Sequence, residues 1–274
     1  MQKSGVLAKL NKSEAARTLG VSRSSLYYVR KRPQLDEELK VQIESVMATH
    51  TDYGHKRIAI HLKMSKERVR RVMKKYNLHP ARRRQKKPHK KEDEGKGARS
   101  VINISKILCP IAPFVVWVAD FTYIRFHNSF IYLATIMDRY TREIVGWYVA
   151  RTHSTLLVLG ALSDALEYTG GRVAIYFHSD QGSEYDATEH ETTIATLGMI
   201  ISMSDKASPW QNGYKESFYS HFKSDFGDPE RFDTLGELIE AIAQHIYYYN
   251  NERIHSVLKM SPVQFRKEYE ERLY

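Results

Sequence analysis

The sequence predicts a mixed α/β domain preceded by all-helical modules, and three observations support this prediction. Apolar residues recur at helical spacing up to about residue 79 and follow the pattern of strands beyond residue 107. A basic stretch without apolar periodicity separates the two regions. Beyond it, strand-like runs give way to alternating helices and strands, which predicts about five strands with helices on both faces of the sheet.

Length and composition agree with more than one folded unit. The 274 residues make nearly two domains of about 150 residues, and 42% hydrophobic with 27% charged residues exclude wholesale disorder. The longest apolar run, 114–119, is far shorter than the roughly 18 residues of a membrane span, and no signal-peptide core follows Met1. We therefore expect a soluble, cytoplasmic protein. The single cysteine, Cys109, excludes an internal disulfide.

The charge is distributed unevenly along the chain. Residues 1–99 carry 27 Lys and Arg against 10 Asp and Glu, whereas the remainder carries 15 against 22, so the net charge of +10 divides into +17 and −7. A basic amino-terminal third is typical of a polyanion binder. An acidic remainder would repel nucleic acid unless metal ions offset its carboxylates. A merely solvated basic surface is the alternative interpretation.

Residues 1–32 are predicted to form a helix-turn-helix module. Two short helices meet at 19–21, and Ser22 is suited to cap the second helix. The expected core residues are Ala15, Ala16, Leu19, Val21 and Leu26. The residues expected to enter a major groove are Arg23, Ser24, Ser25 and Tyr28. Any other helical hairpin is the alternative.

Residues 33–79 are predicted to form a second helical, helix-turn-helix-like module. Its last helix is apolar on one side and basic on the other, and Ser65 can cap it. The residues expected to pack inward are Val69, Val72 and Met73. The residues expected to face DNA phosphates are Arg68, Arg71, Lys74 and Lys75. A merely solvated helix is again the alternative.

Residues 80–106 are predicted to be a basic linker. The segment has no apolar period with which to offset the entropy of ordering. We expect Arg82, Arg83 and Arg84 to contact phosphates without reading sequence. Nuclear localisation is the rival interpretation of such a basic run.

Residues 107–274 contain the pattern of the α/β domain. The first three expected strands form an antiparallel meander at 115–126, 130–138 and 143–150. A helix follows at 156–168, and then the short apolar run 173–177 is typical of a buried parallel strand. The remaining expected elements are a helix, a strand at 199–203, and helices at 214–226 and 235–250.

Three acids occupy positions at which a carboxylate suggests a functional role. Asp120 sits among large apolar residues in the first strand, and a buried carboxylate is costly unless it is paired or coordinated. Asp180 follows the fourth strand, and Glu216 lies on a helix that can lean over the sheet. An all-oxygen cluster suits Mg²⁺, and two ions about 3.5–4 Å apart can assist phosphoryl transfer.

Characteristic motifs surround the three acids. They lie at 117–123, 137–146, 178–182, 201–204, 209–218, 248–250, Arg253, His255 and 261–262. At these residues the chain resembles the bacterial insertion-sequence transposases, which are DDE enzymes related to retroviral integrases. Between Asp180 and Glu216 lie 35 residues, the separation found in this family. The resemblance covers about 115–269.

The resemblance implies a fold, an activity and a site. The fold is α/β, an RNase H-like mixed five-stranded sheet flanked by helices, preceded by the helix-turn-helix modules. Asp120, Asp180 and Glu216 are then the catalytic residues and the ligands of two Mg²⁺ ions, for which Mn²⁺ can substitute. Water would cut a phosphodiester at the end of a mobile element, and the freed 3′-hydroxyl would join it to another phosphate without a covalent protein intermediate.

The resemblance also implies partners and a place of action. The expected partners are double-stranded DNA, as terminal repeats and target DNA, and further copies of the chain in the DNA complex. In a bacterial cytoplasm the protein would associate with the nucleoid when bound to DNA. Gln211 departs from the acidic residue that is common before the Asn of the Glu216 motif. The rival functions are a helix-turn-helix regulator with an inactive, domesticated catalytic domain, and an RNase H-like nuclease without joining activity.

Other polar residues have structural interpretations beside the functional ones. We expect Asp138 to cap a turn with a local arginine partner, and His178 to pack beside a strand end. Glu184 and Asp186 lie on a loop and are expected to be solvated.

Side chains near the end of the expected helix 235–250 are further candidates. Of the three tyrosines at 247–249, at least one is expected to be exposed, because successive helix positions cannot share one face. Arg253 and His255 either touch DNA phosphate or make structural hydrogen bonds.

The two basic segments should differ in what they contribute to DNA binding. Arg23→Ala should reduce the preference for the element's ends over random duplex, because a bidentate arginine contact to guanine contributes roughly 1–3 kcal/mol of discrimination. Replacing Arg82, Arg83 and Arg84 by Ala should weaken binding to both DNAs equally and flatten its salt dependence. Competition binding at fixed salt measures both ratios. A changed ratio in the linker variant alone would contradict the assignment.

Overall fold

A computed structural model describes residues 11–27, 32–81, 101–205 and 213–273. The predictions for Tyr28, for Arg82 to Arg84 and for Gln211 lie outside these residues. No helix in the described ranges is long and apolar enough to cross a membrane.

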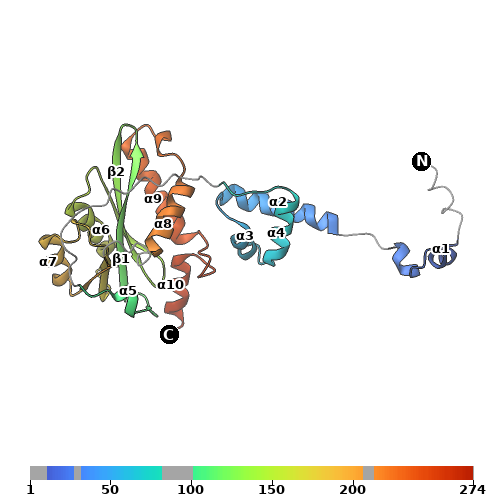
Figure 1. Ribbon diagram of the computed structural model, residues 1–274, viewed down its shortest axis with the longest axis horizontal. Helices are drawn as coiled ribbons and strands as arrows, with labels where there is room; N and C mark the ends of the chain where they lie inside the picture. Colours follow the sequence, from blue (N-terminus) through green and yellow to red (C-terminus); the bar gives the residue numbers. More distant parts are fainter. Residues whose placement is uncertain (1–10, 28–31, 82–100, 206–212, 274) are drawn as a thin grey trace.

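The centre of the α/β part is a five-stranded mixed sheet (Figure 1). Its strands are β1 (Val116–Phe126), β2 (Ser129–Asp138), β3 (Ile144–Ala150), β4 (Tyr176–Ser179) and β5 (Ile200–Met203). The first three pair antiparallel as the predicted meander, whereas β4 pairs parallel with β1, and β5 parallel with β4. The resulting order, β3-β2-β1-β4-β5, is the RNase H-like arrangement.

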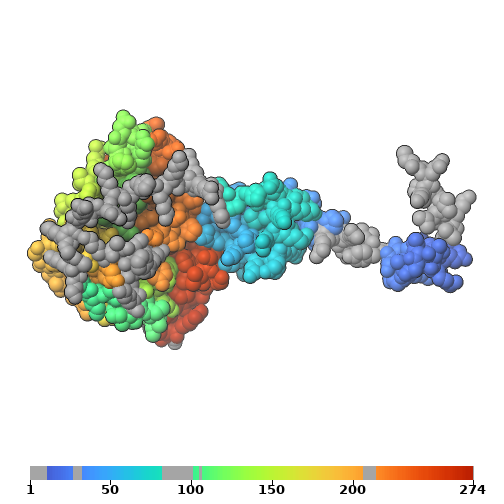
Figure 2. Space-filling view, in the orientation of Figure 1, coloured from blue at the N-terminus to red at the C-terminus, as the bar shows by residue number. Residues whose placement is uncertain are grey.

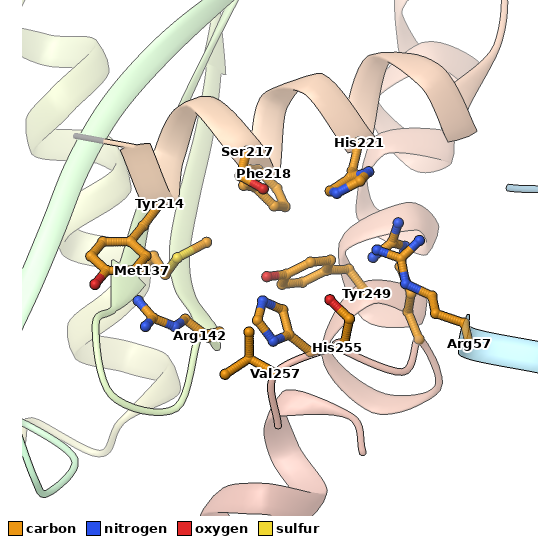
Figure 3. A pocket seen from close by; sticks show the side chains of 12 residues that line it. Arg57, Met137, Arg142, Tyr214, Ser217, Phe218, His221, Tyr249, His255 and Val257 are labelled. Carbon is orange, nitrogen blue, oxygen red and sulfur yellow. The ribbon is translucent and has the colours of Figure 1, made fainter. Parts of the chain in front are cut away.

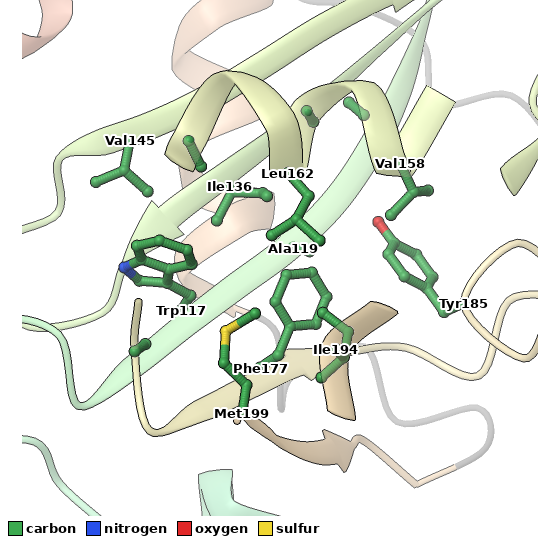
Figure 4. Close-up of a cluster of buried hydrophobic side chains, with 14 of the residues drawn as sticks. Trp117, Ala119, Ile136, Val145, Val158, Leu162, Phe177, Tyr185, Ile194 and Met199 are labelled. Carbon is green, nitrogen blue, oxygen red and sulfur yellow. The ribbon is translucent and has the colours of Figure 1, made fainter. Parts of the chain in front are cut away.

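The sheet separates two apolar cores, and helices cover both of its faces (Figure 1). Helices α6 (Thr155–Tyr168) and α7 (Thr188–Thr196) lie on one face, and α8 (Gly213–Phe226) and α9 (Leu235–Asn251) lie on the other. Because side chains alternate along a strand, β1 contributes Trp117 and Ala119 to the first core but Ile124 and Phe126 to the second. Figure 4 shows the first core, with Phe177 and Tyr185 packed below Ala119 and Leu162.

Some elements differ from the prediction. The fourth strand occupies Tyr176–Ser179 rather than 173–177, because its parallel pairing begins where Val116 meets Tyr176. Three short elements were not predicted: α5 (Ile104–Ile107), a 3₁₀ turn η4 (Pro229–Arg231) and α10 (Pro262–Glu271). Helix α10 has a local signal, since Ser261 accepts a hydrogen bond from the Gln264 N–H and proline occupies its first turn.

The first helical module is only partly as predicted. Helix α1 (Lys12–Thr18) buries Ala15 and Ala16, but the expected second helix is a short 3₁₀ turn, η2 (Arg23–Tyr27). Ser22 caps this turn through the Ser25 N–H. Leu19 and Val21 are 56% and 43% exposed, so they do not form the expected core. Five residues of 3₁₀ helix bury too little apolar surface to cover them.

The second helical module contains three helices around one core. They are α2 (Arg32–Thr49), α3 (His55–His61) and α4 (Lys66–Lys75). Ser65 caps α4 by accepting a hydrogen bond from the Arg68 N–H, as predicted. The expected inward residues Val69, Val72 and Met73 are all buried.

This helical unit packs against the carboxy-terminal part of the α/β domain (Figure 2). Ile254 reaches into the core of the unit, and its backbone N–H donates to the Tyr53 hydroxyl at 2.7 Å. His50 Nδ1 and Tyr248 Oη form a second hydrogen bond of 2.7 Å. Residues about 200 positions apart in the chain therefore hold the two parts together.

The close packing of β3 on α6 depends on a glycine. A Cβ at Gly146 would overlap the Ala161 carbonyl oxygen and lie 2.6 Å from the Ala165 Cβ. Gly146→Ala should therefore lower the free energy of unfolding by about 1–3 kcal/mol. Gly236→Ala, in the first turn of α9 with its nearest neighbour at 3.8 Å, is the control and should be neutral or stabilising. Urea unfolding measures both, and equal effects would contradict this account.

Candidate active site

Asp120 lies in β1, and Asp180 directly follows β4, which pairs parallel with β1. The register pairs Val116 with Tyr176 and Val118 with His178, so two residues further on it brings Asp120 level with Asp180. Adjacent strands are about 4.8 Å apart, and positions two residues apart share a face. Both carboxylates therefore emerge together at the edge of the sheet where β4 ends.

Two buried tyrosines are each affected by the charges of both aspartates. Burial raises the pKa values of Tyr185 and Tyr219 well above the usual value, and the charges of both Asp120 and Asp180 add to each rise. Tyr219 donates its hydroxyl hydrogen to the Asp120 carbonyl oxygen at 2.6 Å. Helix α8 is thereby tied to β1 at the residue that carries the first acid.

The third predicted acid, Glu216, is exposed in the first turn of α8. Its neighbour Lys215 is fully buried instead and donates to the carbonyl and hydroxyl oxygens of Thr135, the residue that pairs with Asp120 in the sheet. Burial lowers the pKa of Lys215 to about 7, and attraction to Asp120 opposes the shift. The side chain of Lys215, rather than that of Glu216, is therefore the group of α8 that reaches the sheet beside Asp120.

The donor set therefore fits a divalent cation in part. Asp120 and Asp180 supply the hard oxygen ligands that Mg²⁺ prefers, on adjacent strands. Within the described ranges, no three His, Cys, Asp or Glu side chains lie close enough together to hold a metal ion. The predicted three-acid cluster is thus represented by its two aspartates, with Glu216 one helix position away from the side chain that faces them.

Glu184 contradicts the expectation that it is solvated. Its carboxylate is buried, and its Oε1 lies 2.5 Å from His153 Nδ1. The His153 ring stacks on Phe121, the residue that follows Asp120. A Cβ added at Gly182 would lie 3.0 Å from Glu184 Oε2 and 3.1 Å from Asp180 Oδ1, so glycine lets the loop fold between these two acids.

His178 has the expected structural role, and Asp138 caps a turn as expected, but among the described residues its hydrogen-bond donors are backbone N–H groups and the Thr141 hydroxyl rather than an arginine. Buried Asp138 accepts hydrogen bonds from the N–H groups of Tyr140 and Thr141, as a turn cap does, and from the Phe114 N–H. His178 is buried beside the strand end, where its Nδ1 bonds the Ser202 hydroxyl. Burial, with a smaller effect from Arg139, lowers the pKa of His178 to about 4.

The basic residues expected to contact DNA fall into two groups. Arg71 and Lys75 both bind Asp36 of α2, and the Arg71 pair is bidentate at 2.6 and 2.7 Å, so the structure gives them a role in holding α4 on α2. The expected residues Arg23, Ser24, Ser25, Arg68 and Lys74 are exposed and so open to a ligand, and Lys75 is exposed as well despite its contact with Asp36.

Arg253 makes structural contacts, the second of its two expected alternatives. Its side chain is 1% exposed and lies between the carboxylates of Asp52, in the helical unit, and Asp225, at the end of α8. Burial raises the pKa of Asp225 to about 7, with Asp52 adding to the rise and Arg253 opposing it. Burial acts the same way on Asp52, but Arg253 and Arg57 outweigh it and lower that pKa.

The tyrosines at the end of α9 point in different directions, as expected. Tyr247 is exposed, and Tyr249 is buried against Phe218. Tyr248 faces the helical unit and bonds His50. Its assignment to an interface could not come from helix spacing, because spacing does not say which unit covers that face.

Comparison with known proteins places these features in a family. Two family models, both described as integrase core domain, match residues 111–209 and 216–269. A 31 kDa protein of insertion element IS600 from Shigella sonnei is 32% identical over 263 residues, which cover 91% of this chain and 96% of that protein. The transposase for insertion sequence element IS904 from Lactococcus lactis is 34% identical over 166 residues, or 60% of this chain and 66% of that one.

Solved structures with a similar fold come from retroviruses. The integrase catalytic core domain of HTLV-2, in complex with magnesium, aligns with a TM-score of 0.46 at 13% identity. The alignment covers 57% of this chain and 98% of the viral domain.

The raised pKa of Asp225, which lies against Arg253, predicts that the stability of the fold depends on pH. The pKa of Asp225 is about 7 in the folded protein and about 3.9 in an unfolded chain, so its stabilising contribution is complete below pH 4 and is lost as pH rises through 7. Asp225→Asn mimics the protonated acid. Its free energy of unfolding should therefore rise relative to the wild type between pH 4 and pH 8, by on the order of 1 kcal/mol or more.

Urea unfolding at several pH values measures this difference, in which the histidine contributions cancel. Asp233→Asn, which removes the same charge at an exposed position before α9, is the matched control. If the difference in free energy of unfolding between Asp225→Asn and the wild type stays constant with pH, the raised pKa of Asp225 is contradicted.

Proposed function

The chain belongs to the insertion-sequence transposases with an integrase core domain, and we propose that Asp120, Asp180 and Glu216 form the site with which it cuts and joins DNA strands. The reaction is a polynucleotidyl transfer at the ends of a mobile element. Water breaks one phosphodiester and releases a 3′-hydroxyl, which then attacks a second phosphodiester, forms a new bond to its phosphorus and displaces the 3′-oxygen of the strand that is cut there. Neither step needs a covalent bond to the protein.

The parallel register of β1 and β4 is the observation that carries this proposal. It sets Asp120 and Asp180 side by side at the end of β4, where α/β sheets commonly present functional groups. A single buried acid would have structural explanations. Two acids at the ends of neighbouring strands, one half-buried and one exposed, are suited to holding a cation that a phosphate can reach.

Glu216 would complete the set from α8. The helix is held against β1 by Tyr219, which is three residues away and therefore on a neighbouring part of the same helix surface. Lys215 and Glu216 are adjacent, about 100° apart around the helix axis. Glu216 is therefore carried by the same helix turns whose Lys215 and Tyr219 side chains reach the strand pair beside Asp120.

The proposed cofactor is a divalent cation held by these three carboxylates, with two Mg²⁺ ions as the full set and Mn²⁺ as a substitute. It would supply a Lewis acid that stabilises charge on the phosphate oxygens. The residues of the chain then have separate tasks. Asp120 and Asp180 set the position of the cation, while Tyr219 and Lys215 set the position of the helix that carries Glu216.

The proposed division of labour follows the charge of the chain. The helical modules at 1–32 and 33–79 and the linker at 80–106 would bind duplex DNA, as terminal repeats or target, and residues 107–274 would perform the chemistry. Exposed Arg23, Arg68 and Lys74 support this role for the modules. Joining couples two DNA ends, so we expect two or more copies of the chain in the complex, acting at the nucleoid.

Charge-removing variants test the catalytic assignment. Asp120→Asn, Asp180→Asn and Glu216→Gln should each abolish cleavage and joining of DNA that carries the element's ends, while end binding stays nearly intact. Metal ligation needs the carboxylate charge, whereas the expected duplex contacts lie elsewhere. The assay incubates protein, end-bearing DNA and Mg²⁺ and sequences the products.

Glu189→Gln is the matched control, because Glu189 is also an exposed glutamate in the first turn of a helix, α7. It should retain activity. Cleavage within a few-fold of the wild type in any of the three variants would remove that residue from the site.

A further inference from the structure

A small cavity lies where the helical unit meets the α/β domain (Figure 3). Its volume is about 190 Å³, and α8 forms its roof through Tyr214, Ser217 and His221. Arg142 from the β2–β3 turn and His255 from the segment after α9 lie opposite, and Arg57 of α3 closes one side. Three separate parts of the chain therefore contribute polar groups to one space.

Several polar atoms at this cavity are buried without a partner among the described residues. They are the donors Nε and Nη1 of Arg142 and Nε of Arg57, together with Nδ1 of His255, which donates in one of the two imidazole tautomers. A buried donor without a hydrogen bond costs about 1–3 kcal/mol, and more when it is charged. Such groups in a native structure call for a bound partner that accepts hydrogen bonds.

The charge around the cavity favours an anion. The guanidinium groups of Arg57 and Arg253 are paired with Asp52 and Asp225, but Arg142 lies against the Tyr214 ring, 3.7 Å from its centroid. None of the residues described as lining the cavity is a carboxylate. Burial lowers the pKa of His255 to about 4, and Arg142, Arg253 and Arg57 add to the shift, which shows the excess of positive charge.

We propose that this cavity binds one phosphate group and that its occupant in the working complex is a backbone phosphodiester of DNA. The site is separate from the aspartates, and its identification with DNA rests on the proposed function. Arg142 would donate from Nε and Nη1 to two phosphate oxygens, the forked geometry that suits arginine to phosphate. His255 would donate from Nδ1, and Ser217 from its hydroxyl.

Size and position favour DNA over a larger free ligand. Pockets for drug-sized ligands have volumes of about 300–1,000 Å³, so this cavity admits one phosphate group but not a whole nucleotide. A backbone phosphate can enter while the rest of the strand stays outside, past the exposed Val257 at the rim. Ser217 directly follows Glu216 in α8, so a strand held here would pass beside the third proposed acid.

The first arm of the test asks whether the site binds phosphate at all. Thermal unfolding of the full chain is followed with EDTA present, in increasing inorganic phosphate and in chloride of equal ionic strength. Phosphate should raise the Tm of the wild type in a saturable way beyond the effect of chloride. Arg142→Gln should lose this response, and Arg272→Gln, the same change at an exposed surface pair, should keep it.

The second arm asks whether DNA supplies the phosphate. Binding of a fluorescent 30-base-pair duplex of random sequence is measured by anisotropy over a range of salt, again with EDTA. Arg142→Gln should weaken binding roughly tenfold at low salt and reduce the slope of log affinity against log salt by about 1. His255→Gln should weaken it in the same direction, and Arg272→Gln should match the wild type.

The outcomes separate this proposal from the proposed function. Loss of the phosphate response and of duplex affinity in Arg142→Gln, with unchanged circular dichroism, supports the site. If Arg142→Gln loses the phosphate response but binds the duplex as tightly as the wild type, DNA is overturned as the occupant. Equal behaviour of Arg142→Gln and Arg272→Gln in both arms would overturn the site itself. Neither arm involves metal or strand cutting, so failure of the catalytic assignment would not affect either reading.

Discussion

The position of α8 relative to the helical unit depends on one buried guanidinium group, that of Arg253. Arg253 binds Asp52, which belongs to the helical unit, and Asp225, which ends α8, while its own backbone follows α9. Removing one partner from a buried ion pair costs about 3–5 kcal/mol, because the remaining charge has no water to stabilise it. These three segments are thus held at one point, and the direction of α8 is set there.

The other end of α8 is held by a second group of contacts. Lys215 and Tyr219 are one helix turn apart and both reach the strand pair that contains Asp120. The helix that carries Glu216 is therefore restrained at its first turns by the sheet and at its last turn by Arg253. Along the same helix, Tyr214, Ser217 and His221 face the cavity, so α8 connects the proposed metal site with the cavity at the helical unit.

Features set by neighbouring residues could be predicted from the sequence, whereas contacts between residues far apart in the chain could not. Strands β1 to β3 and the cap at Ser65 follow from the alternation of side chains and from hydrogen bonds within a few residues, so they could be predicted. The register between β1 and β4 joins residues about 60 positions apart and became visible only in the structure. Glu184 was misassigned because its partner, His153, lies 31 residues away. Sequence spacing likewise could not show the contact of Arg71 with Asp36 or decide between the two alternatives for Arg253, since only the folded chain brings Asp36 and Asp52 to them.

The distance along the chain between Asp52 and Arg253 also has a consequence for synthesis. The two residues are 201 positions apart, so the helical unit leaves the ribosome long before its partner segment exists. At about 5–20 residues per second, this interval is roughly 10–40 seconds. During that time the helical unit can fold on its own core, and its contact surface for the α/β domain remains open. The junction, with its cavity lined by Arg57, Arg142 and Arg253, is therefore completed only after the segment that follows α9 has been made.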